Sequence, residues 1–182
     1  MWIDHNSFSA ERDHDKEHDD GLLDIIHGSD NVTVSWNTFE DHFKGSLVDH
    51  SDKNSGEDTG HLKVTYPHHH FSDVYSRIPI LRFGTGHFYN NYVRGAGTAA
   101  HSRRGAQTHV ENNVFRTTKI AVTTGRSSDV DGYANLRRND LGCAATEISR
   151  TRTFTSPPYS WSAGPVSSVV ASVTAQAGAG RL

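Results

Sequence analysis

Cysteine is almost absent from this sequence: the 182 residues include one, Cys143, so no intramolecular disulfide is available. No run of about 18 apolar residues occurs, so we expect no membrane-spanning helix and no membrane partner. Hydrophobic residues reach only 34%, which is low for a domain with one broad apolar interior. The net charge of −3 gives no general attraction to nucleic acid. These deficits favour a fold that exposes much polar surface or buries polar side chains in hydrogen-bonded rows.

Six short segments share one pattern, in which alternating strand-like residues are followed by a polar residue, a spacer and an apolar residue. The segments are residues 1–8, 32–39, 64–71, 86–93, 108–115 and 134–141. Their polar positions are Asn6, Asn37, His69, Asn91, Asn113 and Asn139, and successive positions are 31, 32, 22, 22 and 26 residues apart. Strands of a β-sandwich recur about every 8–12 residues, so these longer intervals favour coils that each contain several strands.

Stacked coils of this kind form a parallel β-helix, in which each repeated position lies about 4.8 Å from its counterpart on the next coil. Asparagines can pass amide hydrogen bonds along such a row, and aromatic residues can stack beside it. We therefore predict an all-β fold, a parallel β-helix of about six coils. A sandwich whose strands end in turn asparagines is the alternative.

The two longest intervals contain polar insertions, residues 9–19 and 49–60, and insertions in repeat folds often carry function. Residues 142–182 change in composition and become rich in Ser, Ala, Gly and Pro. We therefore divide the chain into a solenoid domain, 1–141, and a partly irregular tail, 142–182, that packs on the solenoid. Within the tail, residues 166–175 are expected to form a short helix.

Five charged residues are candidates for chemistry. Asp20 and Asp24 supply hard oxygen ligands, which suit calcium if a turn brings them together. Lys44, Arg77 and Arg82 follow successive ladder positions and are expected on neighbouring coils. Acids and bases on adjacent coils would form a patch that binds an anionic polymer through a bridging cation and arginine forks. Taken singly, each residue is equally consistent with a solvated acid or a weak surface salt bridge.

Histidine is abundant, and residues 68–70 form a run of three. Adjacent strand residues point to opposite faces, so these three are not expected to bind one metal ion. His69 is expected to replace an asparagine in the ladder through its ring nitrogens. Asn31 begins a sequon for N-glycosylation, which matters only in a secreted chain.

Several blocks resemble the pectate lyase and pectin lyase family of polysaccharide lyases, in its fungal secreted form. The blocks are "DGLLDIIHGSDNVTVSWNTF", "DHFKGSLVDHSD", "LKVTY" and "SRIPILRFGTGHFYNNY". The resemblance runs from Trp2 to about Leu141 and implies a right-handed parallel β-helix. It also implies that the chain lacks an N-terminal part, which in the family holds the first coils and a further calcium-binding acidic strand. No signal peptide opens the chain, and secretion is expected from the family alone.

The resemblance assigns a role to each candidate residue. It implies that Asp20 and Asp24 bind Ca²⁺, that Lys44 contacts the substrate carboxylate, that Arg77 is the catalytic base and that Arg82 steadies substrate or base. The implied reaction is calcium-assisted β-elimination of α-1,4-galacturonan, which gives 4,5-unsaturated oligogalacturonides. The implied partner is polygalacturonate or pectin, and the implied state is a monomer.

Two alternatives stay open at this point. One is a pectin lyase that acts on esterified polymer without calcium; Asp20 and Asp24 argue against it, because that branch replaces the calcium ligands with a fixed cation. The other is a non-catalytic, truncated galacturonan-binding remnant, which the missing acidic strand favours.

Overall fold

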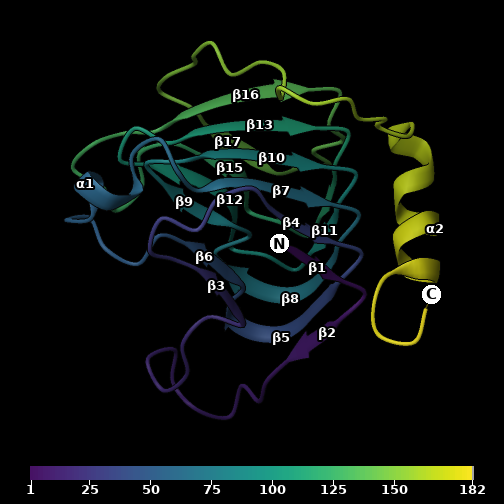
Figure 1. Ribbon diagram of the computed structural model, residues 1–182. Coiled ribbons are helices and arrows are strands. Elements are labelled where there is room, and N and C mark those ends of the chain that lie inside the picture. Colours follow the sequence, from purple (N-terminus) through teal and green to yellow (C-terminus); the bar gives the residue numbers. More distant parts are fainter. Residues whose placement is uncertain (182) are drawn as a thin grey trace.

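The chain winds into stacked coils that contribute strands to three parallel sheets (Figure 1). The computed structural model describes residues 1–181. Sheet A contains, in spatial order, β1 (Trp2–Asp4), β4 (Val32–Ser35), β7 (Lys63–Pro67), β10 (Thr85–Tyr89), β13 (Gln107–Glu111) and β16 (Tyr133–Arg137). Sheet B contains β2 (Ser7–Ser9), β5 (Thr38–Lys44), β8 (His70–Ser76), β11 (Tyr92–Arg94) and β14 (Val114–Arg116). Sheet C contains β3 (Leu23–Ile25), β6 (Ser46–Val48), β9 (Ile80–Arg82), β12 (Thr98–Arg103), β15 (Ile120–Thr123) and β17 (Ala145–Glu147). The six strands of sheet A confirm the predicted parallel β-helix of about six coils.

Equivalent residues of successive coils lie side by side. On sheet A, Phe88 of β10 pairs with Tyr66 of β7 and with Val110 of β13, and all three side chains are buried inside the solenoid. The predicted aromatic row is confirmed, because the ring centroids of Phe39 and Phe71 are 4.7 Å apart and their planes nearly parallel. Each coil thus buries its apolar side chains against the same positions of its neighbours.

The predicted polar ladder runs along the turn between sheets A and B. In its centre, Asn91 accepts a hydrogen bond from the His69 backbone N–H at 2.8 Å and donates to the Asn113 side-chain oxygen at 2.9 Å and to the Tyr66 carbonyl at 2.8 Å. The same pattern continues from Asn113 to Asn139. The ladder therefore satisfies buried backbone groups where the chain leaves a sheet.

His69 joins the ladder as predicted. Its Nδ1 accepts the Asn37 backbone N–H at 3.0 Å, and its Nε2 lies 2.8 Å from the Val34 carbonyl, which defines Nε2 as the protonated nitrogen. Complete burial lowers the pKa of His69 to about 3, so the ring is neutral at physiological pH. A neutral imidazole therefore serves as both donor and acceptor in a row of amides.

The residue before each ladder position has a left-handed backbone conformation. These residues are His5, Trp36, His68, Asn90, Asn112 and Arg138, with φ between 50° and 61°. This conformation is costly for most residues and least costly for asparagine, and it turns the chain sharply from sheet A into sheet B. The ladder hydrogen bonds stabilise the bend on every coil.

After residue 141 the chain still contributes β17 to sheet C, within the segment assigned to the tail from the sequence. The chain then crosses sheet A, and helix α2 (Val166–Gln176) matches the expected short helix. Val169 and Val173 of α2 pack against Val114 on the solenoid. The other helix, α1 (Ser55–Asp58), is a single turn in the second insertion. Neither helix is long and apolar enough to cross a membrane.

Replacing Asn91 by alanine is expected to lower the free energy of unfolding by about 3 kcal/mol, because the buried His69 N–H and Tyr66 carbonyl each lose a partner. Urea denaturation followed by circular dichroism measures the loss. Asn6→Ala is the matched control, since Asn6 is the exposed first rung and should cost much less. Equal losses for the two variants would contradict the buried ladder as the source of stability.

Candidate functional site

Three successive coils align four of the predicted residues at the junction of sheets B and C. The Leu22 N–H donates to the Lys44 carbonyl at 3.2 Å, and Lys44 pairs with Ser76 on the next coil. Asp20 and Asp24 flank Leu22, and Arg77 follows Ser76. The backbone register therefore brings these two acids and two bases, which lie up to 57 residues apart in sequence, to one place.

Asp20 and Asp24 form an acidic pair at the start of β3. Desolvation of Asp24 and then the negative charge of Asp20 raise the pKa of Asp24, while the Leu47 backbone hydrogen bond and the cations Arg77 and Lys44 lower it less. Between them, a Cβ on Gly21 would collide with the Asp24 carboxylate, so glycine permits this close turn. Two carboxylates that repel each other at short range favour a cation between them.

Lys44 is held over the acidic insertion. Its Nζ donates to the Asp19 carbonyl at 3.1 Å and lies 3.6 Å from a Glu17 carboxylate oxygen. The Lys44 side chain is only 12% exposed, whereas that of Glu17 is 71% exposed. The solvent-exposed partner of this pair is therefore the loop carboxylate, which another anion can replace at little cost.

Arg77 stands in the turn between β8 and β9. Its backbone has φ 58°, and its carbonyl accepts the Ser46 N–H at 2.6 Å. Its guanidinium lies 3.4 Å from Asp20, a pair that is 29% and 79% exposed. The neighbouring coil therefore fixes the backbone of Arg77, while its head faces the acidic pair through a weak contact.

Arg82 lies at the end of β9 and points toward the second insertion. It donates to Asp52 at 2.5 Å and to the Asp49 carbonyl at 2.7 Å. Arg103 of β12 also binds Asp52, at 3.0 Å. Burial alone would raise the pKa of Asp52, but the hydrogen bond from Arg82 and the charge of Arg103 lower it overall. The structure thus separates Arg82, on β9, from the acidic pair at β3 by the intervening strand β6, and places it in a cluster centred on Asp52.

Two adjoining hollows connect these groups into one groove, and both are lined by Ser76, Arg77 and Ser127. The first, of about 660 Å³, is also lined by Lys16, Glu17, Phe43, Lys44 and Tyr75. The second, of about 260 Å³, is also lined by Ile80, Arg82, Thr98, His101, Arg103 and Arg126. The groove is therefore mostly cationic and has the exposed Tyr75 ring on its wall. Such a surface suits a polyanion made of rings.

Arg103 and Arg126 are groove residues that sequence reasoning missed. Arg103 pairs in register with Arg82, one coil away. The repeat length could therefore have identified it, because the residue one coil beyond Arg82 in the sequence is also an arginine. Arg126 lies beyond β15 in an irregular turn, where no such spacing applies.

Asp49 supports Arg82 from a buried position. Its side chain is fully buried, and its Oδ2 has no hydrogen-bond partner within residues 1–181. Burial, and then the neighbouring carboxyl group of Asp58, which is also buried, raise the pKa of Asp49 to about 6. The buried residue that supports Arg82 therefore has a carboxyl group that ionises only at higher pH than usual.

The acidic pair fits calcium in the chemistry of its donors. Asp20 and Asp24 offer hard carboxylate oxygens; burial and then the negative charge of Asp20 raise the pKa of Asp24, and a nearby cation would relieve the second of these effects. Calcium takes about six to eight oxygen ligands, so these residues supply part of a coordination shell, and water and substrate carboxylates would supply the rest.

Comparison with known proteins gives one family. A family model described as pectate lyase matches residues 1–182. Curated relatives include a probable pectate lyase A from Aspergillus fumigatus, 44% identical over 98% of this chain and 54% of the relative, and pectate lyase A from Aspergillus niger, 47% identical over the same shares. The chain therefore spans about half the length of the curated relatives it matches.

Solved structures agree. A pectate lyase from Bacillus sp. N165 in complex with trigalacturonate superimposes with a TM-score of 0.89 at 34% identity, covering 99% of this chain and 59% of that one. Pectate lyase C from Erwinia chrysanthemi, solved with Ca²⁺, gives a TM-score of 0.82 at 26% identity, covering 99% and 57%.

Asp49→Asn is expected to flatten the dependence of stability on pH. The folded-state pKa of Asp49, about 6, lies above the ordinary aspartate value of 3.8, so its contribution to stability is fully present below about pH 4 and is lost as the pH rises through 6. Asparagine keeps the shape and removes the ionisation. Urea denaturation between pH 4 and pH 8 tests this, with Asp13→Asn, at an exposed carboxylate, as the control. A wild-type slope that survives in the Asp49 variant would disprove this role.

Proposed function

This chain belongs to the pectate lyase family, and from that premise we propose that it cleaves polygalacturonate by calcium-assisted β-elimination. The observation that carries the proposal is that Lys44 and Arg77 line a continuous cationic groove while Arg77 also contacts Asp20 of the acidic pair. The fold that positions them is the right-handed parallel β-helix of the structural neighbours.

The substrate is an α-1,4-linked galacturonate chain, which carries one carboxylate per ring. Lys44 and Arg82 bind substrate carboxylates, because each is a cation whose acidic contacts lie on polar loops. The exposed face of Tyr75 offers a surface on which a sugar ring can stack. These contacts orient one galacturonate so that its C5 hydrogen faces Arg77.

The reaction breaks the C5–H bond and the C4–O bond of one sugar. Arg77 in its uncharged guanidine form accepts the C5 proton and becomes a guanidinium; the electron pair of the C5–H bond forms the C4–C5 double bond, and the C4 oxygen leaves with a proton from water. Negative charge develops on the carboxylate at C5, where the Lys44 ammonium stabilises it. Calcium held by Asp20 and Asp24 supplies further electrostatic stabilisation of that carboxylate when bound.

Several wider expectations rest on the same proposal. The substrate is a polymer outside cells, so we place the protein in the extracellular space and expect it to act as a monomer. We assign the eliminating site to the solenoid, residues 1–141, and a covering role to residues 142–182. De-esterified polygalacturonate is expected to be the better substrate. Esterification removes the negative charge of the carboxylates that Lys44, and a calcium ion held by Asp20 and Asp24, would bind.

Arg77→Lys is expected to reduce turnover of polygalacturonate by about 100-fold or more, the usual contribution of a positioned base. Ultraviolet absorbance of the unsaturated product measures the rate. Arg116→Lys is the control, because Arg116 lies on β14 of sheet B and pairs with Asp140 away from the groove. Unchanged turnover in the Arg77 variant would remove this residue as the base. Wild-type binding without any product would select the alternative of a non-catalytic galacturonan-binding module.

Removal of calcium is expected to abolish product formation, and added calcium to restore it. The replacement of both Asp20 and Asp24 by asparagine should raise the calcium concentration needed for half-maximal activity by at least 10-fold. The measurement is activity against free calcium, on both de-esterified and highly esterified polymer. Equal rates with and without chelator, together with a preference for the ester, would instead indicate a pectin lyase.

A further inference from the structure

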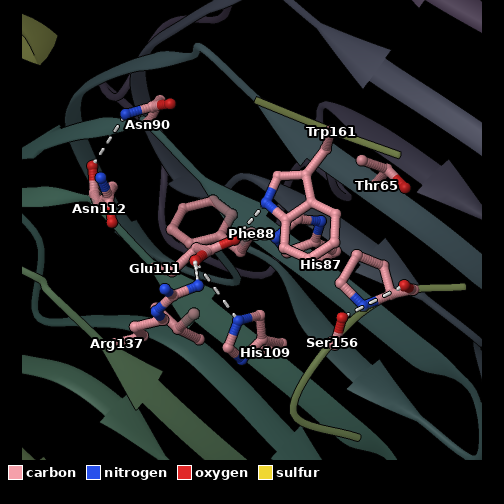
Figure 2. Close-up of polar contacts among 12 residues, drawn as sticks. Thr65, His87, Phe88, Asn90, His109, Glu111, Asn112, Arg137, Ser156 and Trp161 are labelled. Atoms are coloured by element: carbon pink, nitrogen blue, oxygen red, sulfur yellow. Dashed lines mark hydrogen bonds and ion pairs between the residues drawn. The ribbon is translucent and has the colours of Figure 1, made fainter. Parts of the chain in front are cut away.

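A second cluster of ionisable residues lies on sheet A, away from the groove. His87 of β10 and His109 and Glu111 of β13 point outward from the solenoid. They are nevertheless only 1%, 2% and 1% exposed, respectively. They are buried because the tail crosses this face: Tyr159 of the tail contacts His87. Trp161 of the tail contacts Glu111 (Figure 2). Outward residues of a solenoid strand are normally solvated, so this burial needs a separate reason.

Glu111 is the centre of the cluster. Its Oε1 accepts hydrogen bonds from Trp161 Nε1 at 2.6 Å and from His87 Nε2 at 2.9 Å. His87 Nδ1 lies 2.8 Å from the Tyr159 hydroxyl, which lies 2.8 Å from Thr65 Oγ1. One Glu111 oxygen and both His87 nitrogens are therefore engaged, in a chain of hydrogen bonds that ends in the tail.

His109 has no comparable partners. Neither of its ring nitrogens has a hydrogen-bond partner among residues 1–181, although both are buried. Its Nε2 lies 3.6 Å from Glu111 Oε2, too far for a hydrogen bond but close enough to share a third atom between them. A buried imidazole that satisfies neither nitrogen costs stability of the order of a lost hydrogen bond or more, unless something else binds it.

We propose that His87, His109 and Glu111 form a binding site for a divalent transition metal of the zinc class. The three candidate ligand atoms all lie within 4.8 Å of one another. A tetrahedral zinc ion with ligand distances of about 2.0–2.2 Å holds its ligand atoms about 3.3–3.6 Å apart. The 3.6 Å between His109 Nε2 and Glu111 Oε2, the oxygen without a hydrogen bond from Trp161, matches this separation. Two imidazoles and one carboxylate select zinc-class ions over calcium, which prefers an all-oxygen shell.

The protonation states suit such an ion. Burial lowers the pKa of His87 to about 4 and also lowers the pKa of His109, so both rings are neutral near pH 7. Burial alone would raise the pKa of Glu111, but hydrogen bonds from His87 and Trp161 lower it overall. The site therefore presents two neutral imidazoles and one carboxylate, the forms that bind metal.

The surrounding residues would orient the ligands. With the metal on His87 Nε2, the proton moves to Nδ1 and donates to the Tyr159 oxygen, whose own proton turns to Thr65. Trp161 keeps its hydrogen bond to Glu111 Oε1 and leaves Oε2 for the ion. The ion would thus fasten β10 and β13 to the tail that covers them.

One neighbour opposes the ion. Arg137 of β16 lies 3.5 Å from Glu111 Oε2, and its side chain is 51% exposed, at the rim of the cluster (Figure 2). Its positive charge weakens metal binding, and its exposure allows it to swing into solvent. Removing the Arg137 charge should therefore tighten metal binding. A variant that merely loses structure would bind metal more weakly, so the two effects can be told apart.

Titration with Zn²⁺ by calorimetry, with calcium in excess to saturate acidic surface sites, is expected to show one ion bound with a micromolar or lower Kd. Co²⁺ should give visible absorption bands of a tetrahedral site and quench the fluorescence of Trp161, one of three tryptophans. His109→Gln and Glu111→Gln should each weaken zinc binding at least 10-fold, whereas Arg137→Gln should strengthen it several-fold.

His70→Gln is the matched control, because His70 also has a buried nitrogen without a partner within the described chain, but lies on β8 of sheet B. It should leave zinc binding unchanged. No zinc binding by the wild-type protein, or equal binding by the wild type and the His109 and Arg137 variants, would overturn the proposal. Catalysis plays no part in these measurements, so their outcome is independent of the proposed lyase activity.

Discussion

The register between coils is the constraint on which the rest of this structure depends. Parallel backbone hydrogen bonds place each residue beside its counterpart one coil away, and the row from Asn6 to Asn139 locks that register at the sharpest bend. A slip of one residue would turn the inward residues Phe39 and Phe71 outward and break every rung of the ladder at once. The contacts that stabilise the fold therefore also fix the relative positions of the coils. A side chain at the end of a strand is held at a fixed position relative to the equivalent side chain on the next coil.

The groove at the junction of sheets B and C is a consequence of this register. Lys44 pairs with Ser76, which precedes Arg77, and Arg82 pairs with Arg103, so charges separated by whole coils in sequence become neighbours in space. Like charges at such spacing repel one another, and the fold offsets this with acids from the insertions, Glu17 beside Lys44 and Asp52 between two arginines. The insertions thus complete the site electrostatically, while the coils hold it in place.

The ladder and the fold could be predicted from the sequence because a repeated residue at a coil-length interval is visible in one dimension. The five charged candidates could be named because their motifs resemble a known family, and the period alone could have added Arg103. The cluster on sheet A could not be found in this way: His87, His109 and Glu111 occupy outward positions of ordinary strands. Their burial depends on Tyr159 and Trp161, which lie 72 and 50 residues from the side chains they bind, in a tail without periodicity.

Two faces of the same solenoid thus differ in what their outward charged residues contact. At the junction of sheets B and C, Lys44 and Arg77 line a groove and can exchange their weak loop contacts for a ligand. On sheet A the tail excludes water, so His87 becomes neutral and Glu111 remains an anion held by nitrogen donors. Low dielectric strengthens every remaining interaction there, including the cost of an unpaired nitrogen on His109. The covering of one face therefore converts ordinary outward residues into a site with the chemistry of a metal ligand set, whereas the open face keeps the chemistry of a polyanion surface.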